Sequence, residues 1–149
     1  MKKKIYIVVT MMALLTVAGL ASANAQTQSS VQLKANIPFA FSVGNQAMPA
    51  GEYIVRCTNP SSDLKVLQLR STDGHDSVLV RTSSVIGKLQ DGARLVFYRY
   101  DDQYFLAQAW LPSDSIGMQA PKSSNENRMA RKMAPDKPAR EEVALSIKR

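Results

Sequence analysis

Few residues of this sequence could act as a nucleophile, a base or a soft metal ligand. Cys57 is the only cysteine and His75 the only histidine. A cysteine nucleophile needs a base that forms the thiolate, and His75 is the one candidate. Cys57 alternates with Tyr53 and Val55 as a small buried apolar residue would, so we expect a packed thiol. An intermolecular disulfide is the alternative for an unpaired thiol in an oxidising compartment.

Carboxylates accompany the histidine in the run Asp73-Gly74-His75-Asp76. These groups could bind a divalent cation weakly, but Asp-Gly is also typical of a hairpin turn and no third protein ligand is evident. We therefore predict no metal site and no cofactor. The serines lack a Gly-x-Ser-x-Gly setting, and the chain has no Gly-rich phosphate loop. We expect a non-catalytic protein, with a hydrolase that depends on His75 as the least favoured alternative.

Aromatic residues at strand spacing are the candidates for a ligand-binding face. A hairpin is predicted from residue 93 to residue 111, with the three-residue loop Asp101-Asp102-Gln103. In that register Phe97 and Phe105 lie on the core face, and aromatic side chains also line the opposite face. Such a face can bind an unknown small ligand or an envelope component, whereas a second packed layer is the alternative. The candidate ligand-binding residues are Tyr98, Tyr100, Tyr104 and Trp110.

Charge is unevenly distributed along the chain, whose formal net charge is +7. Residues 26–117 hold eight basic and eight acidic side chains, whereas residues 118–149 hold eight basic and four acidic ones. A domain without excess positive charge is poorly suited to phosphate backbones, so we expect no nucleic-acid partner. The basic segment is a candidate surface for anionic envelope or an acidic partner, with a solvated helix face as the alternative. Its candidate binding residues are Arg128, Arg131 and Lys132.

Another hairpin is predicted between residues 64 and 83, around Asp73-Gly74. Asp-Gly favours a two-residue turn in which both central residues have positive φ. If Thr72 pairs with His75, one face of the hairpin is apolar and the other is mostly polar. The apolar face then consists of Leu67, Leu69, Val78 and Val80.

Short alternating segments bounded by turn signals predict further strands. Beyond Pro112, Ser123 and Glu126 form a capping box that favours a short helix as far as Ala134. The last segment, around residues 143–147, is predicted as a closing strand, with a helix as the alternative. We therefore predict an all-β fold: a single antiparallel β-sandwich or small barrel of six to eight strands, with one short C-terminal helix.

The N-terminal residues have the three parts of a secretory signal peptide. Lysines at positions 2–4 precede an apolar stretch from Ile5 to Leu20, and Ala23-Asn24-Ala25 is a cleavage motif, with Ala21-Ser22-Ala23 as the alternative. The apolar stretch is shorter than the roughly 20 residues that span a bilayer. We expect export to the periplasm or the medium, with no transmembrane segment after cleavage. The chain then divides into a signal peptide (1–25), a β domain (26–117) and a basic C-terminal extension (118–149).

Several blocks of the sequence resemble one group of proteins. Residues 37–44 read IPFAFSVG and residues 48–53 read MPAGEY, and matching blocks follow in the same order at 95–100, 104–110 and 123–130. The chain thus resembles an uncharacterised family of small exported bacterial β-domain proteins with an IPFxFxVG…PAGEY signature. The resemblance covers most of residues 35–135, implies an exported single β domain and supplies no catalytic residues. We expect a binding or envelope-associated module, with docking through the basic extension as the alternative.

Overall fold

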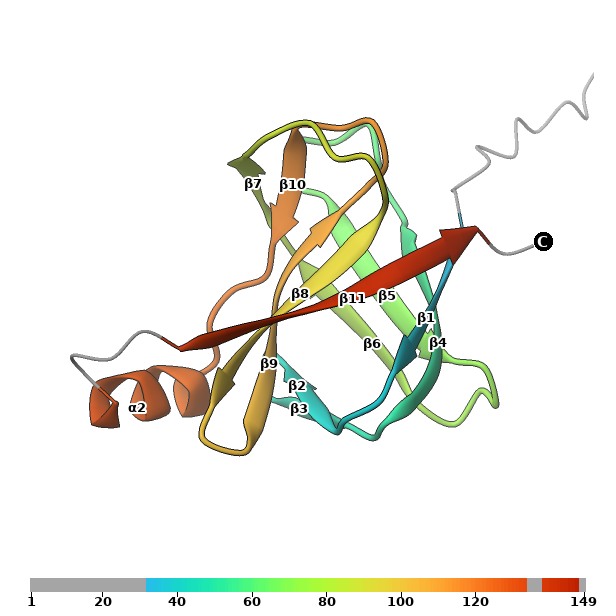
Figure 1. Cartoon of the computed structure of the whole chain (residues 1–149). Coiled ribbons are helices and arrows are strands. Elements are labelled where there is room, and N and C mark those ends of the chain that lie inside the picture. Colours follow the sequence, from blue (N-terminus) through green and yellow to red (C-terminus); the bar gives the residue numbers. More distant parts are fainter. Residues whose placement is uncertain (1–31, 134–137, 148–149) are drawn as a thin grey trace, which may run out of the picture.

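The computed structural model describes residues 32–133 and 138–147. The expected signal peptide, residues 1–25, lies outside these ranges, as does Ala134 at the expected end of the helix. Eleven strands and one helix make up the described chain (Figure 1). In chain order they are β1 (Leu33–Ile37), β2 (Phe41–Val43), β3 (Gln46–Met48), β4 (Gly51–Cys57), β5 (Val66–Ser71), β6 (Ser77–Arg81), β7 (Ser83–Ile86), β8 (Arg94–Tyr100), β9 (Gln103–Trp110), β10 (Ile116–Gln119), α2 (Ser124–Lys132) and β11 (Ala139–Ile147).

The strands follow one hydrogen-bonded path, β3-β2-β9-β8-β11-β1-β4-β5-β6, and β10 and β7 continue beside β9. Of the ladders in the described chain, β2 with β9 is parallel and the others are antiparallel. The path folds over on itself, so that its two end strands, β3 and β6, approach each other. The Gln46 side chain on β3 donates a hydrogen bond to the Ser77 carbonyl on β6 at 3.2 Å. The predicted all-β, sandwich-like class is therefore confirmed. The strands outnumber the expected six to eight because β2, β3, β7 and β10 have only three or four residues each.

The C-terminal strand joins the two halves of the fold. The first part of β11 pairs with β8, from Ala139 to Ala144, and its last residues pair with β1, from Leu145 to Ile147. Figure 1 shows β11 crossing the front of the molecule between these two neighbours. The predicted closing strand is confirmed. The boundary expected between residues 117 and 118 falls inside β10, so the sheet continues beyond it.

The hairpin of β5 and β6 has the predicted register. Leu67 pairs with Val80 and Leu69 with Val78, and these four side chains are buried. The turn differs from the expected two-residue type, because Gly74 has a φ of +82° whereas Asp73 does not have a positive φ. The Gly74 amide donates to the Ser71 carbonyl at 3.0 Å. The Ser71 amide donates to the Asp76 carbonyl at 2.8 Å, and this bond closes a four-residue loop, residues 72–75. The register survives because the loop is symmetric about the same Asp-Gly dipeptide.

The hairpin of β8 and β9 differs from its predicted register near the turn. Its loop has two residues, Asp101 and Asp102, so Tyr100 pairs with Gln103 instead of Tyr104. The predicted pairing returns beyond a β-bulge between Val96 and Phe97. The extra residue is Ala107 of β9, so the β9 side chains between the bulge and the turn move to the opposite face, whereas those of β8 stay where they were predicted. The expected three-residue loop is therefore wrong.

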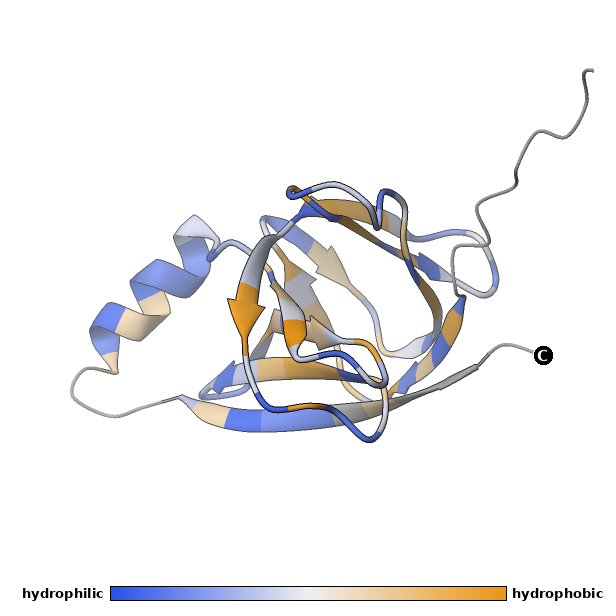
Figure 2. Cartoon of the chain, turned by 90° about the horizontal axis from the view of Figure 1, so that it is seen from above, coloured by the Kyte–Doolittle hydropathy of each residue, from blue (hydrophilic) through white to orange (hydrophobic). Residues whose placement is uncertain are grey.

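The core lies between the two halves of the folded sheet. Seen from above, the strands surround this interior and α2 lies outside them (Figure 2). Buried residues come from nearly every strand and include Leu33, Ile37, Tyr53, Leu69 and Leu95. Within the described ranges, no helix is long and apolar enough to cross a membrane.

Candidate functional site

The four aromatic residues of the expected binding face lie at separate places. The one-residue shift turns Tyr104 toward the core, where its ring stacks on that of Phe39 with centroids 3.9 Å apart. Tyr98 remains half-buried on the outer face, opposite Phe105 in the ladder. The expectation that the four share one face is therefore wrong. The reason is the bulge, which places Phe105 where Tyr104 was expected.

Tyr100 lies beneath α2 and is only 1% exposed. Its hydroxyl donates to Oε1 of Glu126 at 3.4 Å, and its ring contacts Phe105 edge-to-face with centroids 5.7 Å apart. Burial, followed by the charge of Glu126, raises the pKa of Tyr100 to about 12. Tyr100 is therefore a neutral packing residue that fixes the helix on the sheet.

Glu126 is the buried side chain of α2 and is 3% exposed. The predicted N-cap is confirmed, because Oγ of Ser123 accepts a hydrogen bond from the Glu126 amide at 3.0 Å. Burial raises the pKa of the Glu126 carboxyl, while the charge of Lys122, the Tyr100 hydroxyl and the Ser123 amide lower it. The same residue thus serves the helix cap and the contact between helix and sheet.

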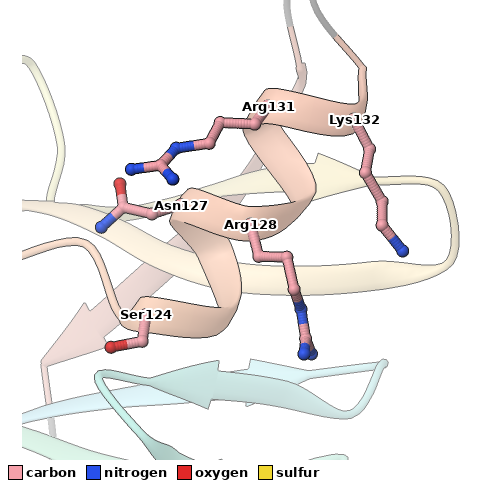
Figure 3. A pocket seen from close by; sticks show the side chains of 5 residues that line it. All are labelled: Ser124, Asn127, Arg128, Arg131 and Lys132. Atoms are coloured by element: carbon pink, nitrogen blue, oxygen red, sulfur yellow. The ribbon is translucent and has the colours of Figure 1, made fainter.

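The exposed side of α2 carries the predicted cations. Arg128, Arg131 and Lys132 are all exposed, and with Ser124 and Asn127 they line an open hollow of about 570 Å³ (Figure 3). Figure 3 shows Arg131 extending beside Asn127, and Arg128 and Lys132 extending together on a neighbouring stripe of the helix. We call the surface formed by Arg128, Arg131 and Lys132 the basic face of α2.

A chain of polar contacts fixes the first turn of this helix relative to the β8–β9 hairpin. The Asn125 side chain donates to Oε1 of Gln103 at 3.1 Å, and Arg128 donates to Oδ1 of Asn125 at 2.6 Å. Together with the contact between Tyr100 and Glu126, these bonds hold the basic face at a defined place beside the sheet.

Trp110 lies on the outer face of β9, beneath the ribbon formed by β7 and β10, and is 4% exposed. The ribbon approaches the indole very closely at two glycines. A Cβ atom on Gly117 would meet Cδ2, Cε2 and Cε3 of the ring at 2.8 Å, and one on Gly87 would overlap Cη2. The indole Nε1 donates to Oε1 of Gln108 at 3.1 Å, which fixes the ring in its plane.

Beside this tryptophan the chain forms a polar hollow of about 330 Å³, which we call the Trp110 pocket. Three cations line it: Lys88 after β7, Arg94 at the start of β8 and Arg140 on β11. Glu142 lies between the two arginines, with Oε2 3.5 Å from Nε of Arg94 and Oε1 3.0 Å from Nη2 of Arg140. Ile86 at the rim is 87% exposed.

The candidate nucleophile and base lie at opposite ends of β4. Cys57 is buried at the last residue of β4, as predicted, and is a free thiol. The loop that carries His75 adjoins the other end, where the Thr72 amide donates to the Glu52 carbonyl. Cys57 lies five residue steps along the strand from Glu52, which is about 16 Å.

His75 is exposed in its loop, with 83% of its side chain accessible to solvent. Its Nδ1 lies 3.5 Å from Oδ2 of Asp73. The Ser71 hydroxyl, followed by the His75 amide, lowers the pKa of Asp73. These contacts organise the turn, and the described chain has no cluster of three or more histidine, cysteine or acidic residues that could hold a metal ion.

Sequence reasoning found Trp110 but missed the pocket beside it. Lys88 and Arg94 lie close together in the chain, but Arg140 comes from the distant strand β11, and only the pairing of β8 with β11 brings the two arginines together. A local signal was nevertheless present. Arg140 and Glu142 alternate as two residues on one face of a strand do, and opposite charges at that spacing are typical of a solvated or ligand-binding face.

Comparisons with protein-family models, with curated proteins and with solved structures find no match for this chain.

Proposed function

We propose that this chain is an exported, non-catalytic module of the cell envelope that attaches to an anionic lipid surface through the basic face of α2. The observation that carries the proposal is the placement of Arg128, Arg131 and Lys132 together on the exposed side of a helix that Glu126 anchors to the sheet. The proposal for export relies on the signal-peptide pattern of residues 1–25 and on the resemblance to the exported family.

The charge distribution supports this surface over others of the molecule. The basic excess of the mature chain comes from residues 118–149, because the basic and acidic residues of positions 26–117 are equal in number. Within the described ranges, none of the ion pairs involves a residue of the basic face. These cations are therefore available to lipid phosphates, each of which can accept hydrogen bonds from them.

A ligand-binding face formed by the aromatic residues has less support than the basic face of α2. Tyr100 and Trp110 are buried, so their truncation is expected to destabilise the fold by about 3–5 kcal/mol, as for other large buried aromatics. Tyr104 contributes to the core on the opposite side of the sheet. Attachment through the helix is therefore the better-supported function.

The test is cosedimentation of the mature chain with vesicles of phosphatidylglycerol, with phosphatidylcholine vesicles as the neutral reference. Each basic residue close to an anionic surface contributes about 1 kcal/mol, so replacing Arg128, Arg131 and Lys132 by glutamine should weaken binding about 100-fold. Binding should also weaken as salt rises, because salt screens exposed charges.

A matched variant separates this face from the total charge of the protein. Replacing Lys34, Arg70 and Arg81 by glutamine also removes three exposed cations, all from β1, β5 and β6. We expect this control to bind the anionic vesicles within about threefold of the unaltered chain. Equal losses in the two triple variants would contradict attachment through α2, as would equal binding to both kinds of vesicle.

A further inference from the structure

We propose that the Trp110 pocket binds a small organic molecule through its carboxylate, and that Arg94 and Arg140 are the residues that recognise it. This site is separate from the basic face of α2, since it lies between the outer face of β8, β9 and β11 and the end of β7. Its ligand is a free small molecule rather than a surface.

The charge of the pocket favours an anion. Lys88, Arg94 and Arg140 line it, and Glu142 is the carboxylate that contacts two of them. Three positive charges and one negative charge leave an excess that an additional carboxylate would offset. The guanidinium group also presents its donors in a planar fork that matches a carboxylate, which an ammonium group cannot do.

One donor of the pocket lacks a hydrogen bond. Nε of Arg94 is buried, and within the described chain it has no acceptor in hydrogen-bonding geometry; Oε2 of Glu142 is 3.5 Å away. A buried donor without an acceptor is unfavourable, and charged donors are the most unfavourable of all. A ligand oxygen placed against Arg94 would satisfy this donor, which makes the arginine a recognition group as well as a partner of Glu142.

Glu142 marks the position that a ligand carboxylate would take. Its two oxygens already lie between the two guanidinium groups, one near Arg94 and the other 3.0 Å from Arg140. Its side chain is 43% exposed and extends from a strand, so it can turn outward into solvent. The ligand would thus compete with an internal carboxylate, and removal of that carboxylate should strengthen binding.

The remaining walls restrict the size of the ligand. Both polar atoms of the Gln108 amide are hydrogen-bonded: Oε1 accepts from Trp110, and Nε2 donates to Gln119 at 2.8 Å. This bonding gives the pocket a fixed wall. Its volume of about 330 Å³ lies at the lower end of the range for small-molecule sites. We therefore expect a single small carboxylate rather than a polymer.

The test uses Trp110 as its own reporter, because it is the only tryptophan of the chain. Benzoate and glucuronate are titrated into the mature protein, with benzamide and glucose as neutral counterparts of similar shape. Binding to a guanidinium pair should give a saturable change in tryptophan emission for at least one carboxylate, with a Kd of about 1 mM or tighter. The neutral counterparts should produce no saturable change.

Three variants assign the effect to the pocket. Arg94→Met and Arg140→Met should each weaken binding of the responding carboxylate at least about tenfold, since each removes a charged hydrogen bond. Glu142→Gln should bind it about threefold more tightly, because it removes a competing negative charge. Arg81→Met, on β6, removes one exposed cation that belongs to neither proposed site and should leave the affinity unchanged.

Three results would each refute the proposal: no saturable response to either carboxylate, an equal response to the neutral counterparts, or weaker binding by Glu142→Gln. Inorganic phosphate is titrated in parallel, and a response to phosphate alone would refute a carboxylate ligand. Circular dichroism of each variant shows whether it is folded, and Glu142→Gln tests the proposal by a gain of affinity even if an arginine variant fails to fold.

Discussion

The close contact between Gly117 and the Trp110 ring predicts that a larger residue at position 117 lowers the stability of the fold. A Cβ added to Gly117 would lie 2.8 Å from three atoms of the ring, whereas ordinary carbon contacts are about 3.5–4.0 Å. The ribbon or the indole would have to move by about 1 Å to accept a methyl group. The hydrogen bond from the indole to Gln108 opposes a movement of the ring. Overpacking of this kind costs about 1–3 kcal/mol.

We therefore expect Gly117→Ala to lower the free energy of unfolding by about 1–3 kcal/mol, and the Tm by about 4–12 °C for a domain of this size. Urea and thermal denaturation followed by circular dichroism measure the free energy of unfolding and the Tm of every variant, and tryptophan emission reports the change around the ring in the variants that keep Trp110. Gly92→Ala is the matched control, since a Cβ there meets nothing within 4 Å and its φ is not in the left-handed region.

The double variant Gly117→Ala, Trp110→Phe makes the test specific to the contact. A smaller ring should relieve the clash, so the double variant should be more stable than the sum of the two single losses predicts. Strict additivity would refute the reasoning. So would a Gly117→Ala protein as stable as Gly92→Ala, because the ribbon would then not be packed on the ring as described.

Three further predictions concern other parts of the chain. Since burial raises the pKa of Glu126 above its usual value of 4.5, the protonated form is favoured on folding. The stability of the unaltered chain relative to Glu126→Gln should thus be greatest below pH 4.5 and fall as the pH rises through the raised value, as urea titrations across pH would show; a difference independent of pH would contradict this. The buried thiol of Cys57 should react with Ellman's reagent only after denaturant unfolds the protein, and immediate reaction in buffer would contradict its burial. Mass spectrometry of the exported protein should give a chain that begins at Gln26, and retention of residues 1–25 would contradict the predicted cleavage.

The two long hairpins show which parts of the fold could be predicted from the sequence. In the β5–β6 hairpin one face is apolar and the other is mostly polar, so a shift of one residue would expose Leu69 and bury Arg70. The pattern therefore determines the register there. In the β8–β9 hairpin Leu95, Val96 and Phe97 are all buried. A one-residue shift exchanges one apolar face for another, so the sequence carries no signal that locates the bulge.

The β-bulge also determines which of the four aromatic residues share a face of the sheet. Alternation along one strand shows which residues share a face only as far as the next bulge, and the four aromatic residues lie on both sides of it. The positions of the cations on α2 do not depend on strand register, because a capping box and a short helix determine them locally. Local signals thus predicted the basic face, while the Trp110 pocket depends on strand pairing between distant parts of the chain.

The position of β11 changes the meaning of the basic C-terminal segment. Because β11 lies between β8 and β1, the cations after residue 117 do not belong to one continuous tail. Arg128, Arg131 and Lys132 lie on a helix outside the sheet, whereas Arg140 is built into the sheet beside Arg94. A deletion of residues 119–149 would remove a central strand together with the helix, and would unfold the protein whether or not the helix binds an anionic surface. Only point substitutions can therefore separate attachment through α2 from recognition in the Trp110 pocket, and each should leave the other intact.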